Sequence, residues 1–417
     1  MVVKCFRKIH ELWTFQGAAK KQGRAVKEAD LSLIKDGAML AIDGKIAWVG
    51  SDNDLNNKIL NELNIQKDPE EIFFKDKVLM PSFVEAHTHS VFAGDRTSEF
   101  EMRNQGKTYQ EIANEGGAIL NIVQATREAS KKMLLQLAQK RVDRFLEQGV
   151  SCLEIKSGYG LDEKNEIKIL NVIKELKGPT IVPTYLGPHA CPPELTIEEY
   201  QKQILEKTLS YIAHNNLAQR VDIFIEKNYF DIQFARAYFK KAKDLGFDIA
   251  AHVEQLSHSG GTILALEYGA KSIEHAVEIT NIEVEAIANS ETTAVLLPTA
   301  DFYLKAPYPP ARNLIDKGAR VALATDFNPG SSPAQDLSFV GVLARLEMKM
   351  SLAESLCAYT LNSAFALGLE HLKGSIDTNK SCDFIVLEDN LSSLFYSVGY
   401  HPVKEVWLAA EQKYKKS

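Results

Sequence analysis

The sequence predicts an α/β fold: a (β/α)8 TIM-like barrel with a small discontinuous β-sandwich domain built from both termini. From about residue 76, short apolar runs alternate with amphipathic stretches, a pattern typical of βαβ units and a parallel sheet. Both ends of the chain have β character instead. The 417 residues also exceed the roughly 250 of a minimal barrel, which leaves room for a companion domain.

Composition excludes several classes of protein. With 45% hydrophobic and 25% charged residues, the chain has a globular composition, which argues against disorder and low-complexity scaffolds. The net charge of -7 predicts no general attraction to nucleic acid or to an anionic membrane. The five cysteines are widely spaced and form no CxxC pair, which fits a reducing compartment. Without an apolar stretch of membrane-spanning length or a leader pattern, we expect a cytoplasmic protein.

The N-terminal segment begins as β structure. Asp43-Gly44 lies between two apolar runs, the strongest short hairpin signal in a sequence. The polar residues 51–70 predict helix and loop.

The central region contains eight candidate barrel strands, at 81–86, 150–155, 180–186, 221–225, 248–251, 272–274, 293–297 and 321–325. Glycine precedes four of these strands closely, where a helix is expected to end in the left-handed region; these are Gly149, Gly246, Gly269 and Gly318.

The C-terminal tail returns to β character. Gly374–Ile376 and Asp383–Leu387 predict strand, turn and strand, and we expect the two ends of the chain to pair across the barrel as one discontinuous domain. The predicted domains are therefore a composite of 1–75 and 370–417, and a barrel over 76–369.

Five residues at the ends of four predicted strands point to a metal site. His87 and His89 follow the first strand, where alternation puts both imidazoles on one face. An isolated HxH pair is more often two ordinary histidines, by about two to one. Here His252, His275 and Asp326 end strands five, six and eight at the same face of the barrel. Imidazoles with a carboxylate suit Zn or non-haem Fe and leave a position for water.

With these residues the sequence resembles the amidohydrolase superfamily and, within it, the imidazolonepropionase family. The resemblance runs from about residue 38 to 387. Its motifs are Pro81–His89 with Ala93–Arg96, Glu154–Leu161, Leu186–Ala190, His252–Leu256 and Thr325–Ser332.

The resemblance implies one Zn²⁺ or Fe ion per subunit, held by His87, His89, His252 and Asp326. It implies hydrolytic opening of 4-imidazolone-5-propanoate to N-formimidoyl-L-glutamate, in histidine degradation, by a homodimer. Carried over by position, the substrate contacts are Arg96, Tyr159, His189, Gln255 and Ser331, and the product contacts are Tyr159, Asn328 and Gly330.

The residue types agree with this chemistry. A metal makes hydroxide available at neutral pH. Asp326 can hold the water and accept its proton, while His275, outside the metal ligands, can stabilise the oxyanion or relay the proton; which of the two is the general base stays open. Arg96 offers the propionate a two-pronged contact. The amides of the loop 328–331 can fix polar substrate atoms.

Other side chains near these motifs have more than one interpretation. Gln255 stands where many relatives carry glutamate, and an amide cannot take a proton. Glu254 is the alternative acid, although strand alternation points it away. Lys156 ends a barrel strand; we expect a single metal, with Lys156 in a supporting or structural role. Taken alone, Arg96 fits a surface salt bridge, Tyr159 fits packing under a turn, and His189 fits a structural cap.

Two further classes of function compete with this hypothesis. One is another small-ring hydrolase or a deaminase acting on guanine, cytosine or hydantoin-like rings; a neutral nucleobase would not need Arg96. The other is a non-catalytic metal-binding barrel, which the complete set of ligand and acid residues disfavours.

Overall fold

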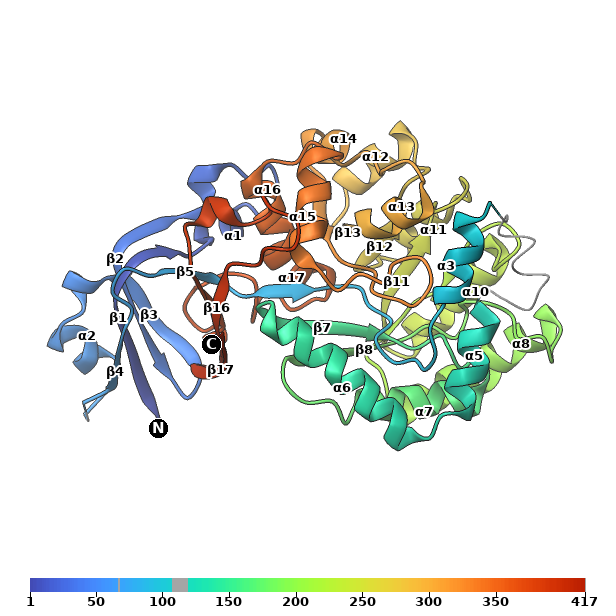
Figure 1. Cartoon of the computed structure of the whole chain (residues 1–417), viewed down its shortest axis with the longest axis horizontal. Helices are drawn as coiled ribbons and strands as arrows, with labels where there is room; N and C mark the ends of the chain where they lie inside the picture. Colours follow the sequence, from blue (N-terminus) through green and yellow to red (C-terminus); the bar gives the residue numbers. More distant parts are fainter. Residues whose placement is uncertain (67, 107–118, 417) are drawn as a thin grey trace.

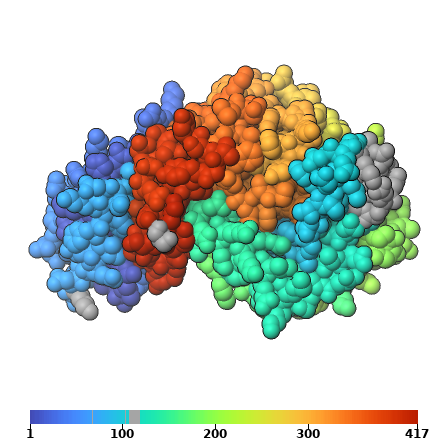
Figure 2. Space-filling view, in the orientation of Figure 1, coloured from blue at the N-terminus to red at the C-terminus, as the bar shows by residue number. Residues whose placement is uncertain are grey.

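The computed structural model describes all residues except 67, 107–118 and 417. The chain forms a parallel barrel and a separate sheet made from both termini (Figure 1). The C-terminal segment lies against the N-terminal part on one side and against the barrel on the other (Figure 2). No helix among the described residues has the length and apolarity needed to cross a bilayer.

The barrel contains the eight predicted strands in sequence order. Parallel pairing runs from β6 to β14, and an isolated parallel bridge between Thr88 and Phe327 joins the first strand segment to the last. The fourth barrel strand is split into two short pieces on either side of Asp222 and Ile223. The strands are β6 (Phe83–Glu85), β7 (Val150–Lys156), β8 (Thr180–Tyr185), β9 (Arg220–Val221) with β10 (Phe224–Ile225), β11 (Asp248–Val253), β12 (Ser272–His275), β13 (Thr293–Leu296) and β14 (Arg320–Leu323).

Helices connect these strands. The four glycines expected before strands all adopt positive φ, between 64° and 94°, which confirms that prediction. The helices of the barrel are α3 (Thr97–Asn104), α5 (Ile119–Glu128), α6 (Lys131–Glu147), α7 (Glu163–Ile173), α8 (Ile197–Gln203), α9 (Leu209–His214), α10 (Ile232–Asp244), α11 (Gly261–Glu267), α12 (Asn281–Ala288), α13 (Pro298–Leu304), α14 (Ala311–Asp316), α15 (Leu337–Leu346), α16 (Leu352–Cys357) and α17 (Ser363–Ala366).

The terminal strands form one mixed sheet of eight strands. Its order is β17-β16-β15-β5-β1-β2-β3, with β4 paired to β1. The antiparallel pairing of β15 with β5 joins the C-terminal tail to this sheet. The strands are β1 (Val3–Trp13), β2 (Leu33–Ile42), β3 (Lys45–Ser51), β4 (Glu70–Phe73), β5 (Val78–Pro81), β15 (Phe384–Leu387), β16 (Val403–Leu408) and β17 (Glu411–Lys415); the short helices α1 (Gln16–Lys20) and α2 (Asn57–Glu62) belong to the same N-terminal region.

The predicted hairpin is confirmed, and one predicted strand is wrong. Asp43 and Gly44 link β2 to β3 with φ of 47° and 80°, the left-handed pair that a tight hairpin turn needs. Gly374–Ile376 is not a strand: Ile376 is buried and its amide donates to the carbonyl of Thr14. Ile376 thus packs in the core without pairing in a β-sheet.

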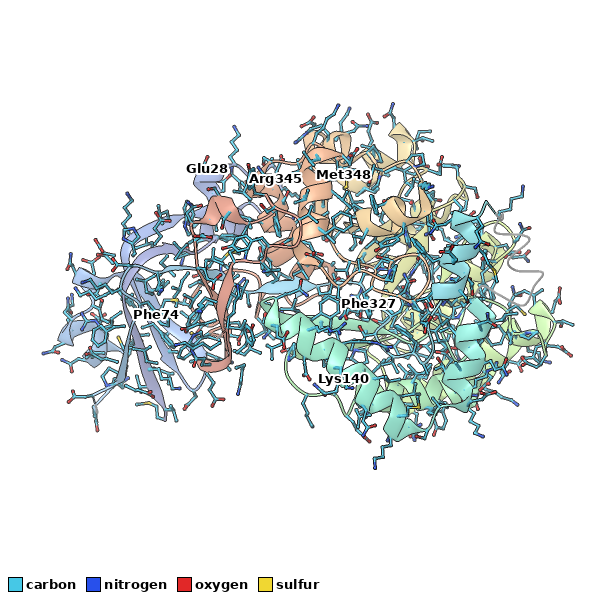
Figure 3. The ribbon with its side chains drawn as sticks, in the orientation of Figure 1. Glu28, Phe74, Lys140, Phe327, Arg345 and Met348 are labelled. Atoms are coloured by element: carbon cyan, nitrogen blue, oxygen red, sulfur yellow. The ribbon has the colours of Figure 1, made fainter. Side chains whose placement is uncertain are left out.

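The terminal sheet has its own aromatic core. The rings of Phe6, Phe74, Phe384 and Trp407 pack at centroid distances of 5.1–6.1 Å, and Figure 3 shows Phe74 within this domain and Phe327 within the barrel. The chain passes from this sheet to the barrel at Ser82, between β5 and β6. The boundary at residue 76 remains a prediction, and β5 just beyond it is hydrogen-bonded within the terminal sheet.

Candidate active site

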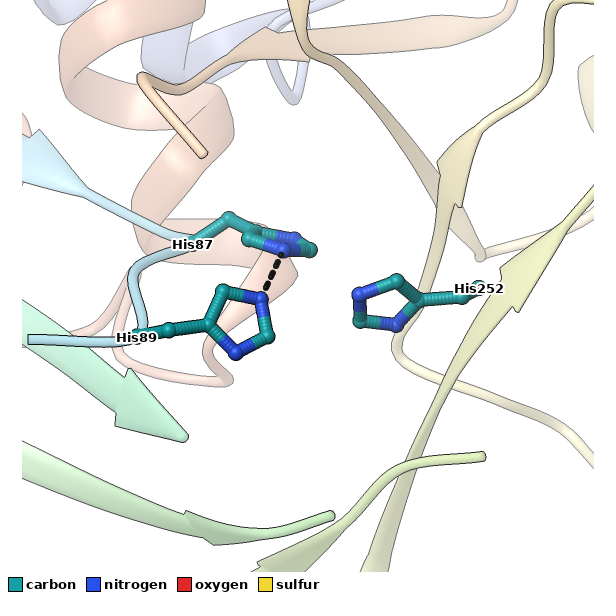
Figure 4. A group of neighbouring side chains, drawn as sticks. All are labelled: His87, His89 and His252. Atoms are coloured by element: carbon teal, nitrogen blue, oxygen red, sulfur yellow. Dashed lines mark hydrogen bonds between the residues drawn. The ribbon is translucent and has the colours of Figure 1, made fainter. Parts of the chain in front are cut away.

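Three histidines and one aspartate converge at the C-terminal ends of the barrel strands. His87 and His89 follow β6, His252 lies on β11 and Asp326 follows β14. The Nε2 atoms of His87 and His89 are 3.3 Å apart (Figure 4). Asp326 Oδ1 lies 3.2 and 3.4 Å from them. All four side chains are at most 4% exposed. The predicted ligand set is therefore assembled at one place.

This donor set fits a metal ion. His87, His89 and His252 offer ligand nitrogens that lie within 4.8 Å of one another. Imidazole nitrogens and a carboxylate oxygen directed at one buried point are the ligands that Zn and non-haem Fe prefer. The ring of His275 lies 5.2 Å from that of His252 and 5.9 Å from that of His87, centroid to centroid. It is close to the set without belonging to the group of convergent nitrogens, as predicted.

Burial and neighbouring charges shift the pKa values of these groups in different directions. Burial lowers the pKa of His89 to about 4 and holds that of His275 well below its usual range. Burial would lower the pKa of His87 too, but Glu274 and Asp326 outweigh it and raise the value to about 10. Although burial alone would raise the pKa of Asp326, its contacts with His87 and His89 hold it well below its usual range. Asp326 is thus ionised at neutral pH.

Two carboxylates behind the histidines were missed by sequence reasoning. Glu274 Oε2 lies 2.7 Å from His87 Nδ1, and Asp222 Oδ2 lies 2.9 Å from His252 Nδ1. Lys156 contacts both carboxylates and is fully buried. Each of these acids stands inside an apolar strand segment of the sequence. Because unpaired charges are almost never fully buried, that position could have indicated a buried acid with a charged partner.

The rings of Tyr159 and His189 pack beside the ring of His89. The His189 ring stacks on His89 at 5.4 Å and 16°, and its Nδ1 is 2.9 Å from the carbonyl of Gly158. The Tyr159 ring lies 5.9 Å from His89 and 5.7 Å from His189. The structure therefore places the rings of Tyr159 and His189 next to His89, and their contact with substrate stays a prediction.

A buried glutamate holds the loop that carries Tyr159. Glu166, on α7, accepts hydrogen bonds from the backbone amides of Gly158, Gly160 and Leu161 at 2.6–2.9 Å. The glycines allow the chain to wrap closely around this carboxylate, as the atoms of Glu166 and its neighbours already fill the space beside Gly160. The position of Tyr159 thus depends on Glu166.

Arg96 lies against the loop after β14, and its charge is paired. Its Nε and Nη2 contact Glu99 Oε2 at 2.7 and 2.6 Å. Its Nη1 faces Gly330 so closely that a Cβ on Gly330 would be 2.2 Å from it. The sequence suggested separate roles for Arg96 and Gly330. In the structure the Arg96 guanidinium packs directly against Gly330.

The loop 328–331 is built around Asn328. Its Oδ1 accepts from the amides of Gly330 and Ser331, both at 2.8 Å, and its Nδ2 donates to the carbonyl of Asp326 and to Ser331 Oγ. In this structure both amides donate to Asn328, and their binding of substrate atoms stays a prediction. Ser331 Oγ instead points toward Asp326 Oδ2, 3.5 Å away.

Gln255 is not joined to the other site residues by any contact that the described part of the chain provides. It is half-buried, in the bend after β11. Its neighbour Glu254 faces away from the site, as expected: its carboxylate accepts from the amides of Gly261 and Thr262 at the start of α11. Glu254 therefore stabilises a helix start and is not the alternative acid.

Comparison with known proteins assigns the family. Residues 78–412 match the model of the amidohydrolase family. An imidazolonepropionase of Bdellovibrio bacteriovorus is 47% identical over 402 residues, covering 96% of this chain and 94% of the relative. An imidazolonepropionase of Solibacter usitatus is 39% identical over 404 residues and covers 95% of each chain.

Solved structures share the fold at low identity. A zinc-bound adenosine deaminase from Xanthomonas campestris superposes with a TM-score of 0.73 at 16% identity, covering 98% of this chain and 92% of the other. A guanine deaminase of E. coli gives a TM-score of 0.71 at 13% identity and covers 100% of both chains. These likenesses confirm the barrel architecture.

Proposed function

The chain belongs to the imidazolonepropionase family, within the amidohydrolases, and we propose that it hydrolyses the ring C–N bond of 4-imidazolone-5-propanoate to give N-formimidoyl-L-glutamate. The observation that carries the proposal is the convergence of His87, His89, His252 and Asp326 beside an arginine. Full-length identity of 36–47% to proteins of this name supports it.

His87, His89, His252 and Asp326 would hold the metal. When bound, a Zn²⁺ or Fe ion lowers the pKa of a coordinated water to about 7 and polarises a carbonyl. The chain supplies buried ligand side chains, and the exclusion of water strengthens the electrostatic contacts among them.

Asp326 is the proposed proton acceptor for the attacking water. Its carboxylate is ionised, and Ser331 Oγ, 3.5 Å from Oδ2, orients it. His275 is a neutral imidazole at neutral pH because burial disfavours its charged form. It can donate a hydrogen bond to the oxygen of the ring carbonyl as negative charge develops there. This assignment makes Asp326 the base and His275 the oxyanion donor.

Arg96 is the proposed partner of the propionate. Glu99 occupies its Nε and Nη2 side, so the guanidinium is held in one orientation with Nη1 toward the loop 328–331. Tyr159, His189, Gln255 and Ser331 would contact the imidazolone, and Tyr159, Asn328 and Gly330 the product. A nucleobase deaminase would have no use for the partly buried cation at this position.

The test is turnover by purified, metal-loaded protein, followed by loss of the imidazolone absorbance. Guanine, cytosine and hydantoin serve as alternative substrates. We expect turnover of imidazolonepropionate and none of the alternatives; release of ammonia from a nucleobase instead would favour the deaminase hypothesis.

Replacing Arg96 by alanine is expected to raise KM about 10- to 100-fold with a smaller change in kcat, since a charge-assisted hydrogen bond contributes about 1.5–3 kcal/mol. Gly330→Ala should raise KM in the same direction, because its Cβ would displace Arg96 Nη1. Steady-state kinetics of both single variants and of the double variant check this.

The double variant is the control for this prediction. If Gly330→Ala acts only by moving Arg96, it has no further effect once Arg96 is alanine. Additive effects of the two substitutions would show that Gly330 acts independently of Arg96, and an unchanged KM in Arg96→Ala would remove Arg96 from propionate binding.

The remaining details are proposals that follow from the family. The metal is Zn²⁺ or Fe, which elemental analysis of the purified protein distinguishes. A homodimer is proposed, testable by light scattering. We also place the enzyme in the cytoplasm, where its five unpaired cysteines would stay reduced.

A further inference from the structure

A cluster of buried charges lies directly behind the metal ligands. Lys156 Nζ is 2.9 Å from Glu154 Oε2, 2.8 Å from Asp222 Oδ2 and 3.0 Å from Glu274 Oε2. It also donates a hydrogen bond of 3.1 Å to Glu274 Oε1. These four side chains are 0% exposed and come from three parts of the barrel, β7, the break between β9 and β10, and β12.

Two of these carboxylates face the ligand histidines. Glu274 Oε2 is 2.7 Å from His87 Nδ1 and 3.4 Å from His252 Nδ1, and Asp222 Oδ2 is 2.9 Å from His252 Nδ1. Neither Nδ1 atom meets the geometry of a hydrogen bond in the described chain, and its polar contacts at these distances are the ion pairs with the carboxylates. A carboxylate at Nδ1 favours the tautomer with its proton there, which leaves the Nε2 lone pair for a cation.

We propose that Lys156 is a positioning residue for the metal site: it anchors Asp222 and Glu274, which orient His87 and His252 with Nε2 toward the metal. The inference rests on the proposed function, since it concerns the same metal. Three carboxylates around one ammonium also require that Lys156 stays unmodified. Carboxylation would replace the ammonium by an anion beside three carboxylates, and the contacts of Lys156 with Glu154, Asp222 and Glu274 would become repulsive.

The charges of the cluster are arranged to favour a cation. Lys156 and Arg220 carry two positive charges against three negative charges on Glu154, Asp222 and Glu274; Arg220 Nε lies 3.4 Å from Glu154 Oε1. The excess negative charge lies on the side of Glu274 and Asp222, which contact the histidines. Lys156 therefore reduces the repulsion between the carboxylates without cancelling their attraction for a metal.

Glu154 offers a matched control. Glu154 shares the burial and the Lys156 contact of the other two acids, and one of its oxygens lies within 4.8 Å of a His87 ring nitrogen. Among the described residues it forms no ion pair with an imidazole, and its Oε1 accepts from Thr184 Oγ1 at 2.5 Å. Glu154→Gln thus perturbs the cluster without removing a group that touches His87 or His252 directly.

The experiment measures binding of Zn²⁺ and Co²⁺ to metal-free protein by competition with a chelator, with the visible spectrum of bound Co²⁺ as a second readout. We expect Glu274→Gln and Asp222→Asn to weaken metal binding about 10- to 100-fold. The Co²⁺ spectrum should change in both variants. Glu154→Gln should leave affinity within a few-fold of wild type and the spectrum unchanged.

Lys156→Met should weaken binding as Glu274→Gln does, and the double variant Lys156→Met/Glu274→Gln should lose little more, because the lysine acts through the glutamate. If Lys156→Met does not fold, as judged by circular dichroism, the two acid variants still decide the proposal. Equal metal affinity in wild type, Glu274→Gln and Asp222→Asn overturns it. A wild type that binds no metal overturns the proposed function instead.

Carboxylation is tested on the same protein with ¹³C-labelled bicarbonate. We expect no carbamate carbon signal and no effect of bicarbonate on metal binding. A carbamate signal that disappears in Lys156→Met would overturn the assignment of Lys156 as an ammonium.

Discussion

Replacing Asp326 by asparagine is expected to lower kcat on imidazolonepropionate by about three orders of magnitude, within the range of about 10²–10⁴ that general acid–base catalysis contributes. The amide keeps the shape of the side chain but cannot accept a proton. It also removes the negative charge that contacts His87 and His89 at 3.2 and 3.4 Å. KM should change much less than kcat.

Kinetics and metal content of the same preparation check this prediction. Asp316→Asn is the matched control, because Asp316 is exposed and pairs only with Arg312 among the contacts described. Turnover of metal-loaded Asp326→Asn at the wild-type rate would contradict the role of Asp326 as base and leave His275 as the alternative.

Replacing Glu166 by alanine is expected to destabilise the protein by about 3 kcal/mol and to lower kcat/KM at least about tenfold. The amides of Gly158, Gly160 and Leu161 would lose their acceptor inside the protein, and each buried unsatisfied donor costs about 1–3 kcal/mol. Tyr159 lies between these amides in the chain, so its ring would no longer be held against His89 and His189.

Thermal or denaturant unfolding and steady-state kinetics measure the two effects. Glu175→Ala is the control, since Glu175 is half exposed and its pair with Lys131 contributes little. Wild-type stability in Glu166→Ala would show that the loop does not depend on this carboxylate.

Glu166 also predicts a pH dependence of stability. Burial, only partly offset by hydrogen bonds, raises its pKa from 4.5 to about 6. A raised carboxyl pKa favours the protonated form in the folded state, so this group's contribution to stability falls as the pH rises from about 4.5 to about 6, by about 2 kcal/mol. Measured against Glu166→Gln, which does not titrate, wild-type stability should decline through this range. A difference independent of pH would contradict the shifted pKa.

The barrel strands and the positions of the four proposed metal ligands were predictable because both follow from the local sequence pattern. Apolar runs mark the strands, and the register of His87, His89, His252 and Asp326 at strand ends follows from strand alternation. Glu254 was expected to face away by the same alternation, and it does.

Long-range contacts were not predictable from the same pattern. Glu274 and Asp222 meet His87 and His252 only because the barrel closes, and the close approach of Arg96 to Gly330 joins loops far apart in the chain. The amides of Gly330 and Ser331 were expected to be available, but the side chain of Asn328 accepts them within its own loop. The apolar Ile376 suggested a strand, whereas burial alone explains it.

The most direct test of the account is the fate of the solvent oxygen. Metal-loaded protein is incubated with imidazolonepropionate in H₂¹⁸O and the product is identified by mass spectrometry. Attack of water on the ring carbonyl predicts N-formimidoyl-L-glutamate with one ¹⁸O in the newly formed carboxylate and no release of ammonia. Unlabelled product, release of ammonia in step with substrate loss, or no turnover with either Zn²⁺ or Fe would contradict it.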